Sequence, residues 1–392
     1  MICANPRCDH IKYAIRDIIA PAEELEKQGK KILKLNIGDP DQFDFDTPQF
    51  IKDALVEAVK DHTNNGYTAS AGSEMLRTAI ADREKRFKRV DLDPNKIIVT
   101  NGVSEALMFL FCALVGKGDE VLIPGPSYPP YTSYVKMLGA KPVEYKCDES
   151  NGWQPDVDDI ASKISDKTRA FVSINPNNPT GALANEKTLK KMVDVLAPTG
   201  IPIISDEIYD LMTFKEPAHM SAVAKDVPLI LLNGMSKVYL SPGWRIGSMA
   251  FRGGCDEIFE ACMKQARIRL CANGPAQFAY AKALMSDHSH IKPTVEKLRE
   301  RRDFAYKRLN EIDGLSAAKP EGAFYIFPKI ENNKYKDDKE WVLELLKQKN
   351  VLTVFGSGFG QEYGKGHFRI VYLPPMETLT KAFDKIEEFM KV

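Results

Sequence analysis

Short apolar runs alternate with stretches of helical periodicity from about residue 96 onward. Apolar side chains in segments such as 104–115 and 187–196 recur at the spacing of one helix face. The runs between these segments are rich in β-branched residues, and several are apolar at nearly every position, which is typical of strands covered on both faces. The predicted strands are residues 96–100, 120–123, 141–145, 169–174, 201–205, 229–232 and 246–251.

This alternation predicts an α/β fold with a large unit, residues 46–285, whose mainly parallel seven-stranded sheet is covered by helices. A smaller α/β unit is expected after the helical stretch 275–285. The leading residues have no core of their own, so we expect residues 1–45 and 286–392 to form this smaller unit together. Its predicted strands are 323–327, 351–355 and 368–372, and its helices lie near 341–348 and 377–390.

Charge and hydropathy disfavour two classes of partner. Lys plus Arg and Asp plus Glu both number 54, so the formal net charge is zero, which argues against nucleic acid or an anionic membrane as the main partner. No stretch approaches about 18 consecutive apolar residues, so a membrane-spanning helix is not expected. The charged residues Arg7, Asp9, Lys12, Arg16 and Asp17 interrupt the N-terminus, which therefore lacks the apolar core of a signal peptide.

The seven cysteines form no CxxC pair and no tight framework. In a chain of this length they are interpreted as reduced thiols of a cytoplasmic protein, most of them buried. Cys3 and Cys8 are close in sequence, but no cluster of His or Cys nearby completes a tetrahedral set. We therefore expect no metal site.

Chemically useful side chains gather just after the predicted strands. Ligands of an open α/β sheet bind beyond the carboxyl ends of its strands. One edge of the sheet thus collects a lysine, a carboxylate, two phenols, hydroxyls and an amide, which predicts a ligand site. The segments concerned are residues 101–104 (NGVS), 126–129 (PSYP), 175–181 (NPNNPTG), 206–209 (DEIY) and 233–237 (NGMSK).

The residues around Ser104 allow two interpretations. They lead directly into a helix, so their amides and hydroxyl could hold a phosphate at its positive end, or Ser104 could simply cap that helix. Ser236 and Arg245 add further donors, and the turn at 241–243 could fold Arg245 back towards Ser236. Because neither a Walker A pattern nor a strand-linked GxGxxG is present, a small phosphorylated cofactor is favoured over a nucleotide.

Lys237 and Asp206 both end apolar strands and should both face this edge of the sheet. A nucleophilic amine must lose its proton, which desolvation and nearby cations favour. A buried carboxylate at position 206 would be costly unless it met a cation, such as a protonated pyridine nitrogen. Tyr128, between two prolines, offers an aromatic face, although such a residue more often only packs.

Together these motifs resemble the class I/II aminotransferases of the fold-type I pyridoxal-phosphate enzymes. The resemblance covers nearly the whole chain, and its overall pattern is closest to the alanine aminotransferases. Each motif alone could arise by chance, whereas their shared order and spacing make coincidence improbable. The most specific motifs are residues 175–181 (NPNNPTG), 205–209 (SDEIY) and 236–237 (SK) followed by 242–247 (PGWRIG).

The resemblance implies pyridoxal 5'-phosphate as cofactor and a role for each motif residue. Lys237 would carry the cofactor covalently and shuttle the substrate proton, and Asp206 would keep the pyridine nitrogen protonated. Tyr209 would act beside them in catalysis. The implied ring contacts are Asn178, Tyr209 and Tyr128, and the implied phosphate contacts are Val103, Ser104, Ser236 and Arg245.

Three further residues gain roles only through the resemblance. Arg369 would clamp the substrate α-carboxylate with its planar fork, although without that context it would be interpreted as a surface arginine on a strand. Gly38, together with Asn178, would approach the substrate. Tyr67 would reach the phosphate of a neighbouring subunit, which implies a homodimer.

The resemblance implies a ping-pong transfer between an amino acid, most simply alanine, and a 2-oxo acid, most simply 2-oxoglutarate. No second arginine for a distal carboxylate is evident from the sequence, so an aromatic or branched-chain donor stays open. The same scaffold also hosts carbon–sulfur lyases that use an equivalent lysine and aspartate, and a non-catalytic module that senses the cofactor is a further alternative.

Overall fold

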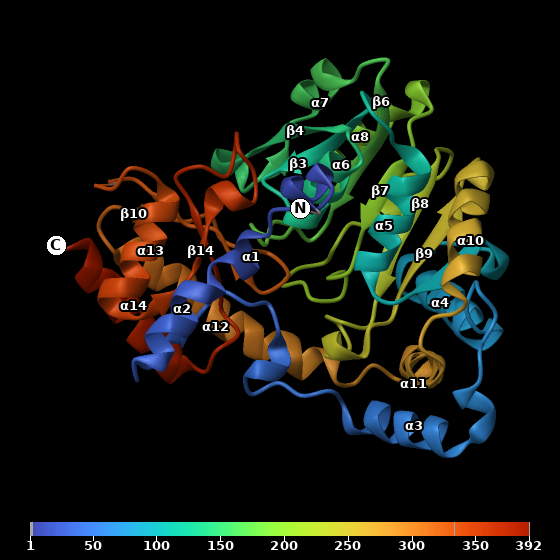
Figure 1. The fold of residues 1–392 in the computed structure, drawn as a ribbon, viewed down its shortest axis with the longest axis horizontal. Helices are drawn as coiled ribbons and strands as arrows, with labels where there is room; N and C mark the ends of the chain where they lie inside the picture. Colours follow the sequence, from blue (N-terminus) through green and yellow to red (C-terminus); the bar gives the residue numbers. More distant parts are fainter. Residues whose placement is uncertain (1–2, 333, 392) are drawn as a thin grey trace.

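The computed structural model describes residues 3–332 and 334–391. Residues 1–2, 333 and 392, which belong to the predicted smaller unit, lie outside the described residues. A mixed, mostly parallel sheet forms the centre of the larger part of the molecule (Figure 1), in the order β2-β9-β8-β7-β6-β3-β4-β5. Its strands are β2 (Ile97–Thr100), β3 (Glu120–Gly125), β4 (Lys141–Asp148), β5 (Gln154–Pro155), β6 (Thr168–Ile174), β7 (Ile203–Asp206), β8 (Leu229–Gly234) and β9 (Gly247–Arg252).

All seven predicted strands of this sheet are present, but the expected strand number was one too low. The eighth strand, β5, pairs antiparallel with β4 at one edge. With two residues, one of them Pro155, β5 is too short to show an alternating pattern, and proline is confined to such edges. Besides β5, only β9 among the described strands of this sheet runs against the parallel direction.

The nearly continuous apolar strands are explained by helices on both faces. Along β3, Val121 and Ile123 belong to the core beneath α5, α6 and α10, whereas Leu122 belongs to the core beneath α8. Helices α4 and α11 cover the end of the sheet that carries β2. The helices of this part are α3 (Gln49–Lys60), α4 (Glu74–Lys88), α5 (Val103–Leu114), α6 (Pro129–Met137), α7 (Val157–Lys163), α8 (Glu186–Leu196), α9 (Met220–Val223), α10 (Asp256–Arg269) and α11 (Gly274–Met285).

Residues 14–34, near the start of the chain, pack with the C-terminal part beside this sheet, whereas residues 6–10 contact α6. Figure 1 shows the N-terminal helices α1 and α2 next to the C-terminal helices, and β1 pairs in parallel with β13. The unit boundaries at residues 45/46 and 285/286 stay a prediction. The elements here are α1 (Ala14–Asp17), α2 (Ile19–Lys27), β1 (Leu33–Lys34), α12 (Ile291–Glu311), β10 (Leu315–Ser316), β11 (Tyr325–Ile326), β12 (Lys329–Ile330), α13 (Asp338–Lys349), β13 (Val351–Leu352), β14 (Val354–Phe355), β15 (Phe368–Val371) and α14 (Met376–Met390).

Short 3-10 helices occupy several of the connections. Two of them border the site described below, because they follow Asp39 and Ser241. The 3-10 helices are η1 (Pro6–His10), η2 (Pro40–Gln42), η3 (His62–Asn65), η4 (Pro94–Lys96), η5 (Glu149–Asn151), η6 (Ala197–Thr199), η7 (Pro242–Trp244) and η8 (Gly356–Gly358).

The expectation that most cysteines are buried was wrong. All seven are free thiols, but only Cys147, Cys255 and Cys262 are buried. Cys112 illustrates the reason, because it lies on α5 at a position that the core of the sheet does not cover. Within the described residues, no helix combines the length and the apolar character that a bilayer crossing requires.

Candidate active site

A cavity of about 450 Å³ opens at the carboxyl ends of the parallel strands. Its lining includes residues from the segments that follow β2, β3, β6, β7 and β8, as the sequence predicts. Eleven of the twelve predicted site residues line it, and Tyr67 does not. Those that line it are Gly38, Val103, Ser104, Tyr128, Asn178, Asp206, Tyr209, Ser236, Lys237, Arg245 and Arg369.

Lys237 is partly exposed to this cavity and surrounded by protein. Its Nζ donates a hydrogen bond to the Gly38 carbonyl at 2.7 Å. Burial lowers the pKa of Lys237 to about 8, and the charge of Arg369 also lowers it, whereas Asp39 opposes this shift. At pH 7 about a tenth of the amine is therefore neutral and nucleophilic, far more than for an ordinary lysine.

Gly38 has a packing reason to be glycine. A Cβ built at this position would overlap the Tyr325 hydroxyl and would also crowd the Phe324 ring. The missing side chain lets the Gly38 carbonyl approach both the lysine and the cavity.

Asp206 ends β7 and is 5% exposed. One carboxylate oxygen accepts a hydrogen bond from Tyr131 Oη at 2.7 Å, and the other accepts from the Ile208 amide at 3.2 Å. Burial raises the pKa of Asp206 to about 6, although these two hydrogen bonds oppose the shift. Among the described residues, no ammonium or guanidinium forms an ion pair with it. A buried carboxylate of this kind fits a cationic ligand atom.

The aromatic residues at the site form hydrogen-bonded pairs. Tyr209 Oη lies 2.8 Å from Tyr325 Oη, and Tyr128 Oη lies 3.0 Å from Tyr13 Oη. The Tyr13 ring meets the Tyr128 ring edge-on at 6.1 Å, so one face of Tyr128 stays available in the cavity. These pairs hold the phenols in place around the cavity.

The amino end of α5 forms the polar end of the cavity. Gly102, with φ of 80°, is the N-cap, and no side chain caps this helix, so the alternative in which Ser104 is the cap was wrong. A Cβ at Gly102 would overlap the Arg245 guanidinium, which lies against this turn. The hydroxyls of Ser104 and Ser236 make no hydrogen bond within the described part of the chain. Unpaired helix amides, two free hydroxyls and a guanidinium are suited to a phosphate.

Arg369 is not the surface residue that its strand position alone suggested. It is 1% exposed, and its guanidinium lies 4.5 Å from the centre of the Tyr325 ring. One Nη donates to Asn178 Oδ1 at 2.9 Å, the other donates to the Asn36 carbonyl, and Nε has no partner among the described residues. The Arg369 guanidinium therefore faces the cavity with N–H donors still unpaired. A buried, positively charged donor of this kind suits an anionic group of a ligand.

Sequence reasoning missed four residues of this site. Arg16 and Tyr13 reach the cavity from the N-terminal segment, Tyr325 lies on β11, and Tyr131 lies one turn along α6 from Tyr128. Arg16 is a second arginine, which the sequence analysis did not identify. A period of two along the strand at 323–327 could have marked Tyr325, but no local signal places residues 13–16 against a sheet that begins at residue 97.

A family model described as aminotransferase class I and II matches residues 30–386. The chain belongs to this family. Pyridoxal 5'-phosphate is the cofactor of class I and II aminotransferases, and therefore of this enzyme, which transfers amino groups between amino acids and 2-oxo acids. The predicted family, fold and cofactor are thereby confirmed.

Several similar aminotransferases are known over nearly the full length. An alanine aminotransferase of Mycobacterium tuberculosis is 39% identical over 400 residues, covering 98% of this chain and 92% of that protein. The glutamate-pyruvate aminotransferase AlaA of Escherichia coli K12 is 38% identical, covering 98% and 97%. A solved structure of an alanine aminotransferase from Pyrococcus furiosus superimposes with a TM-score of 0.97 at 53% identity, covering 99% and 100%.

Proposed function

We propose that this aminotransferase moves the amino group between alanine and 2-oxoglutarate, yielding pyruvate and glutamate. The observation that carries the proposal is one cavity in which Lys237, Asp206 and two arginines, Arg369 and Arg16, face a common space. The names of the similar alanine and glutamate-pyruvate aminotransferases support the choice of substrates.

The donor set of the cavity fits the cofactor from end to end. Asp206 would meet the ring nitrogen, Asn178 and Tyr209 the phenolic oxygen, and Tyr128 one face of the ring. When bound, pyridoxal 5'-phosphate supplies an aldehyde for the amino group and a ring that withdraws electrons from the substrate α-carbon. The phosphate would lie at the start of α5, where the donors are the amides near Val103, the hydroxyls of Ser104 and Ser236, and Arg245.

Lys237 holds and moves the proton of the transfer. Because its pKa is lowered to about 8, part of the amine is neutral near neutral pH, so its Nζ could take a proton from the substrate α-carbon and later return it. The Tyr209–Tyr325 and Tyr13–Tyr128 pairs line the cavity that this amine faces. Arg369 orients the substrate by its α-carboxylate, which keeps the α-carbon within reach of the lysine.

Arg369→Lys is expected to raise KM for both amino acids and 2-oxo acids by about tenfold while changing kcat much less. A point charge replaces the planar fork that binds a carboxylate at two points, and the contact to Asn178 is weakened as well. Steady-state kinetics with alanine and 2-oxoglutarate measure this. An unchanged KM for every substrate would contradict the role of Arg369.

Arg16→Met is expected to raise KM for glutamate and 2-oxoglutarate by about tenfold and to leave KM for alanine and pyruvate nearly unchanged. The substitution keeps an unbranched apolar stem but removes the guanidinium charge that would meet a second carboxylate, which only the five-carbon substrates carry. Half-reaction kinetics with each substrate alone measure the change for glutamate and 2-oxoglutarate separately from the change for alanine and pyruvate. Equal changes for alanine and glutamate would show that Arg16 does not read the distal carboxylate.

A panel of amino donors, scored by the spectral change of the bound cofactor, tests the proposed substrates. Alanine and glutamate should react fastest, and glutamate should accumulate from alanine plus 2-oxoglutarate. A preference for aromatic or branched-chain donors would replace the proposed substrates. Release of ammonia from cysteine-like donors without glutamate formation would instead indicate a lyase.

We also propose that the enzyme is a homodimer in which Tyr67 completes the partner's site. Tyr67 is 84% exposed and lies apart from the cavity of its own chain. Tyr67 follows η3, which contacts α3 and α11, and large exposed apolar side chains lie on these two helices and at the end of α10. They are Val56, Val59, Ile268, Leu270 and Met285. Exposed apolar side chains that gather on one face are typical of an interface.

Mixing two inactive chains is expected to restore activity if this dimer forms. Lys237→Ala removes the amine but keeps Tyr67, whereas Tyr67→Phe keeps the amine, so one site of a mixed dimer contains both groups. Activity of the co-refolded mixture should exceed the sum of the separate variants several-fold. A mixture whose activity equals that sum, or a chain that sediments as a monomer, would contradict the shared site.

A further inference from the structure

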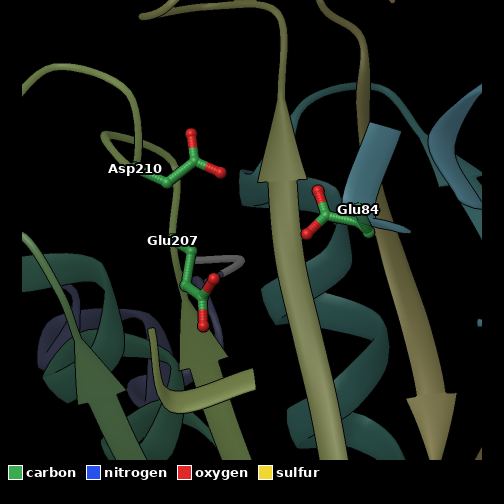
Figure 2. Close-up of side chains that lie close together, drawn as sticks. All are labelled: Glu84, Glu207 and Asp210. Carbon is green, nitrogen blue, oxygen red and sulfur yellow. The ribbon is translucent and has the colours of Figure 1, made fainter. Parts of the chain in front are cut away.

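A cluster of buried charged side chains lies between α4 and the segment that follows β7, next to the edge of the sheet that carries Asp206. Figure 2 shows Glu84, from α4, converging with Glu207 and Asp210, which follow β7. All three side chains are at most 1% exposed. The Nζ of Lys88 lies 2.8, 2.7 and 2.6 Å from carboxylate oxygens of Glu84, Glu207 and Asp210. The ammonium thus occupies the space that the three carboxylates could offer a metal ion.

Arg83, the neighbour of Glu84 on α4, extends this cluster towards Lys237. Its two Nη atoms bind both oxygens of Asp210, at 2.7 and 2.8 Å. Its Nε donates to Tyr239 Oη at 3.3 Å, and the arginine is 2% exposed. Asp210 lies four residues after Asp206, and Tyr239 lies two residues after Lys237, so one guanidinium joins the two segments that carry the catalytic groups.

Two further hydrogen bonds hold the two partners of Arg83, one at Asp210 and one at Tyr239. Asn233, at the end of β8 and before Lys237, donates to Asp210 at 2.8 Å. Tyr239 Oη also lies 3.0 Å from His288 Nε2, in the connection between α11 and α12. Strand pairing between β7 and β8 ends at Asp206 and Leu232, and one further backbone bond, from the Glu207 amide to the Leu232 carbonyl at 3.0 Å, continues it. Asp210 lies three residues beyond that bond.

We propose that Arg83 is a positioning residue of the transamination centre. By binding Asp210 and Tyr239 together, it fixes the distance between the Asp206 carboxylate and the Lys237 amine. This inference rests on the proposed roles of Asp206 and Lys237. Fixing that distance matters because displacing a reacting group by about 1 Å can cost about a hundredfold in rate.

The charge of Arg83 must be kept when the link is tested. Removing it would leave Lys88 to balance the three buried carboxylates, and the excess buried negative charge could unfold the protein. Arg83→Lys keeps the charge but loses the fork that holds Asp210 and Tyr239 at once. Tyr239→Phe changes no charge and removes only the hydroxyl, so it carries the test by itself if Arg83→Lys does not fold.

Both variants, loaded with cofactor, are expected to lose about tenfold in kcat with little change in KM, because neither residue touches the substrate. The pH midpoint at which the bound cofactor changes its absorbance should also shift, by about half a unit, since that midpoint depends on how Asp206 and Lys237 face the ring. The affinity of the cofactor-free protein for pyridoxal 5'-phosphate gives a third readout, which should fall several-fold.

Two matched controls lie outside the network. Arg77→Lys changes an arginine on the same helix that binds the Pro94 carbonyl, and Tyr145→Phe removes a buried hydroxyl that donates to the Val172 carbonyl. Both should keep kcat and the absorbance midpoint. Variants of Arg83 and Tyr239 that melt earlier but keep kcat and the midpoint would overturn the proposal. A wild-type enzyme that shows no half-reaction would refute the proposed function instead.

Discussion

Lys237→Ala is expected to abolish the visible absorbance of covalently bound cofactor and to lower kcat by about 10⁴-fold or more. The substitution removes both the amine that captures the aldehyde and the group that moves the proton. The Lys237 amine has no neighbouring replacement among the described lining residues, because the other cations there, Arg16, Arg245 and Arg369, carry guanidinium groups in place of a primary amine. Absorbance spectra and single-turnover kinetics with alanine measure the two losses separately.

The stability of the Lys237→Ala protein should be close to that of the wild type. The hydrogen bond to the Gly38 carbonyl and two long contacts to the Tyr209 and Phe324 rings are lost, but removal of a partly desolvated ammonium offsets this. Lys163→Ala is a matched control, since this lysine also donates to a backbone carbonyl but lies outside the cavity. A small amine added to the medium should restore part of the proton transfer in Lys237→Ala. If the variant kept its absorbance and turnover, the lysine assignment would be wrong.

The segments after the parallel strands were predictable because topology brings them to one edge. Lys237, Asp206 and Asn178 each follow an apolar strand that a sequence pattern can recognise, so their meeting in one cavity needs only the rule that strand ends converge. Their motifs then indicated the chemistry. This explains why the prediction succeeded for groups on the sheet.

The missed groups come from elements whose placement depends on tertiary packing. Arg16 lies on a four-residue helix, and Tyr131 differs from any other buried tyrosine only by the carboxylate it meets. The burial of Arg83 and Lys88 could not be predicted from the sequence for the same reason. In the sequence they belong to a charged helix of a kind that ordinarily faces solvent, and the carboxylates after β7, together with Glu84, make their burial possible.

Asp206→Asn is expected to lower kcat by about 10³-fold while the protein stays folded. The amide has nearly the shape of the carboxylate and can still accept a hydrogen bond from Tyr131 through its oxygen, but it carries no negative charge. The ring nitrogen would then lose the anion that keeps it protonated, and the electron-withdrawing power of the ring would fall. Asp206→Ala should lose at least as much, because it also leaves the Tyr131 hydroxyl and the Ile208 amide unpaired.

The loss of activity in Asp206→Asn is expected from the pKa of Asp206, which burial raises to about 6 without the cofactor. A raised pKa means that the anion is destabilised in its surroundings, so it gains more than an exposed carboxylate would by meeting a cation. The gain is mutual: the ring nitrogen keeps its proton to a higher pH beside Asp206 than it would in water. Asp338→Asn is the matched control, since this carboxylate is also buried and binds the Ser357 amide far from the cavity. Because Asp338 is not linked to the ring, only Asp206→Asn should weaken both cofactor affinity and turnover, and equal turnover in the two variants would remove Asp206 from the mechanism.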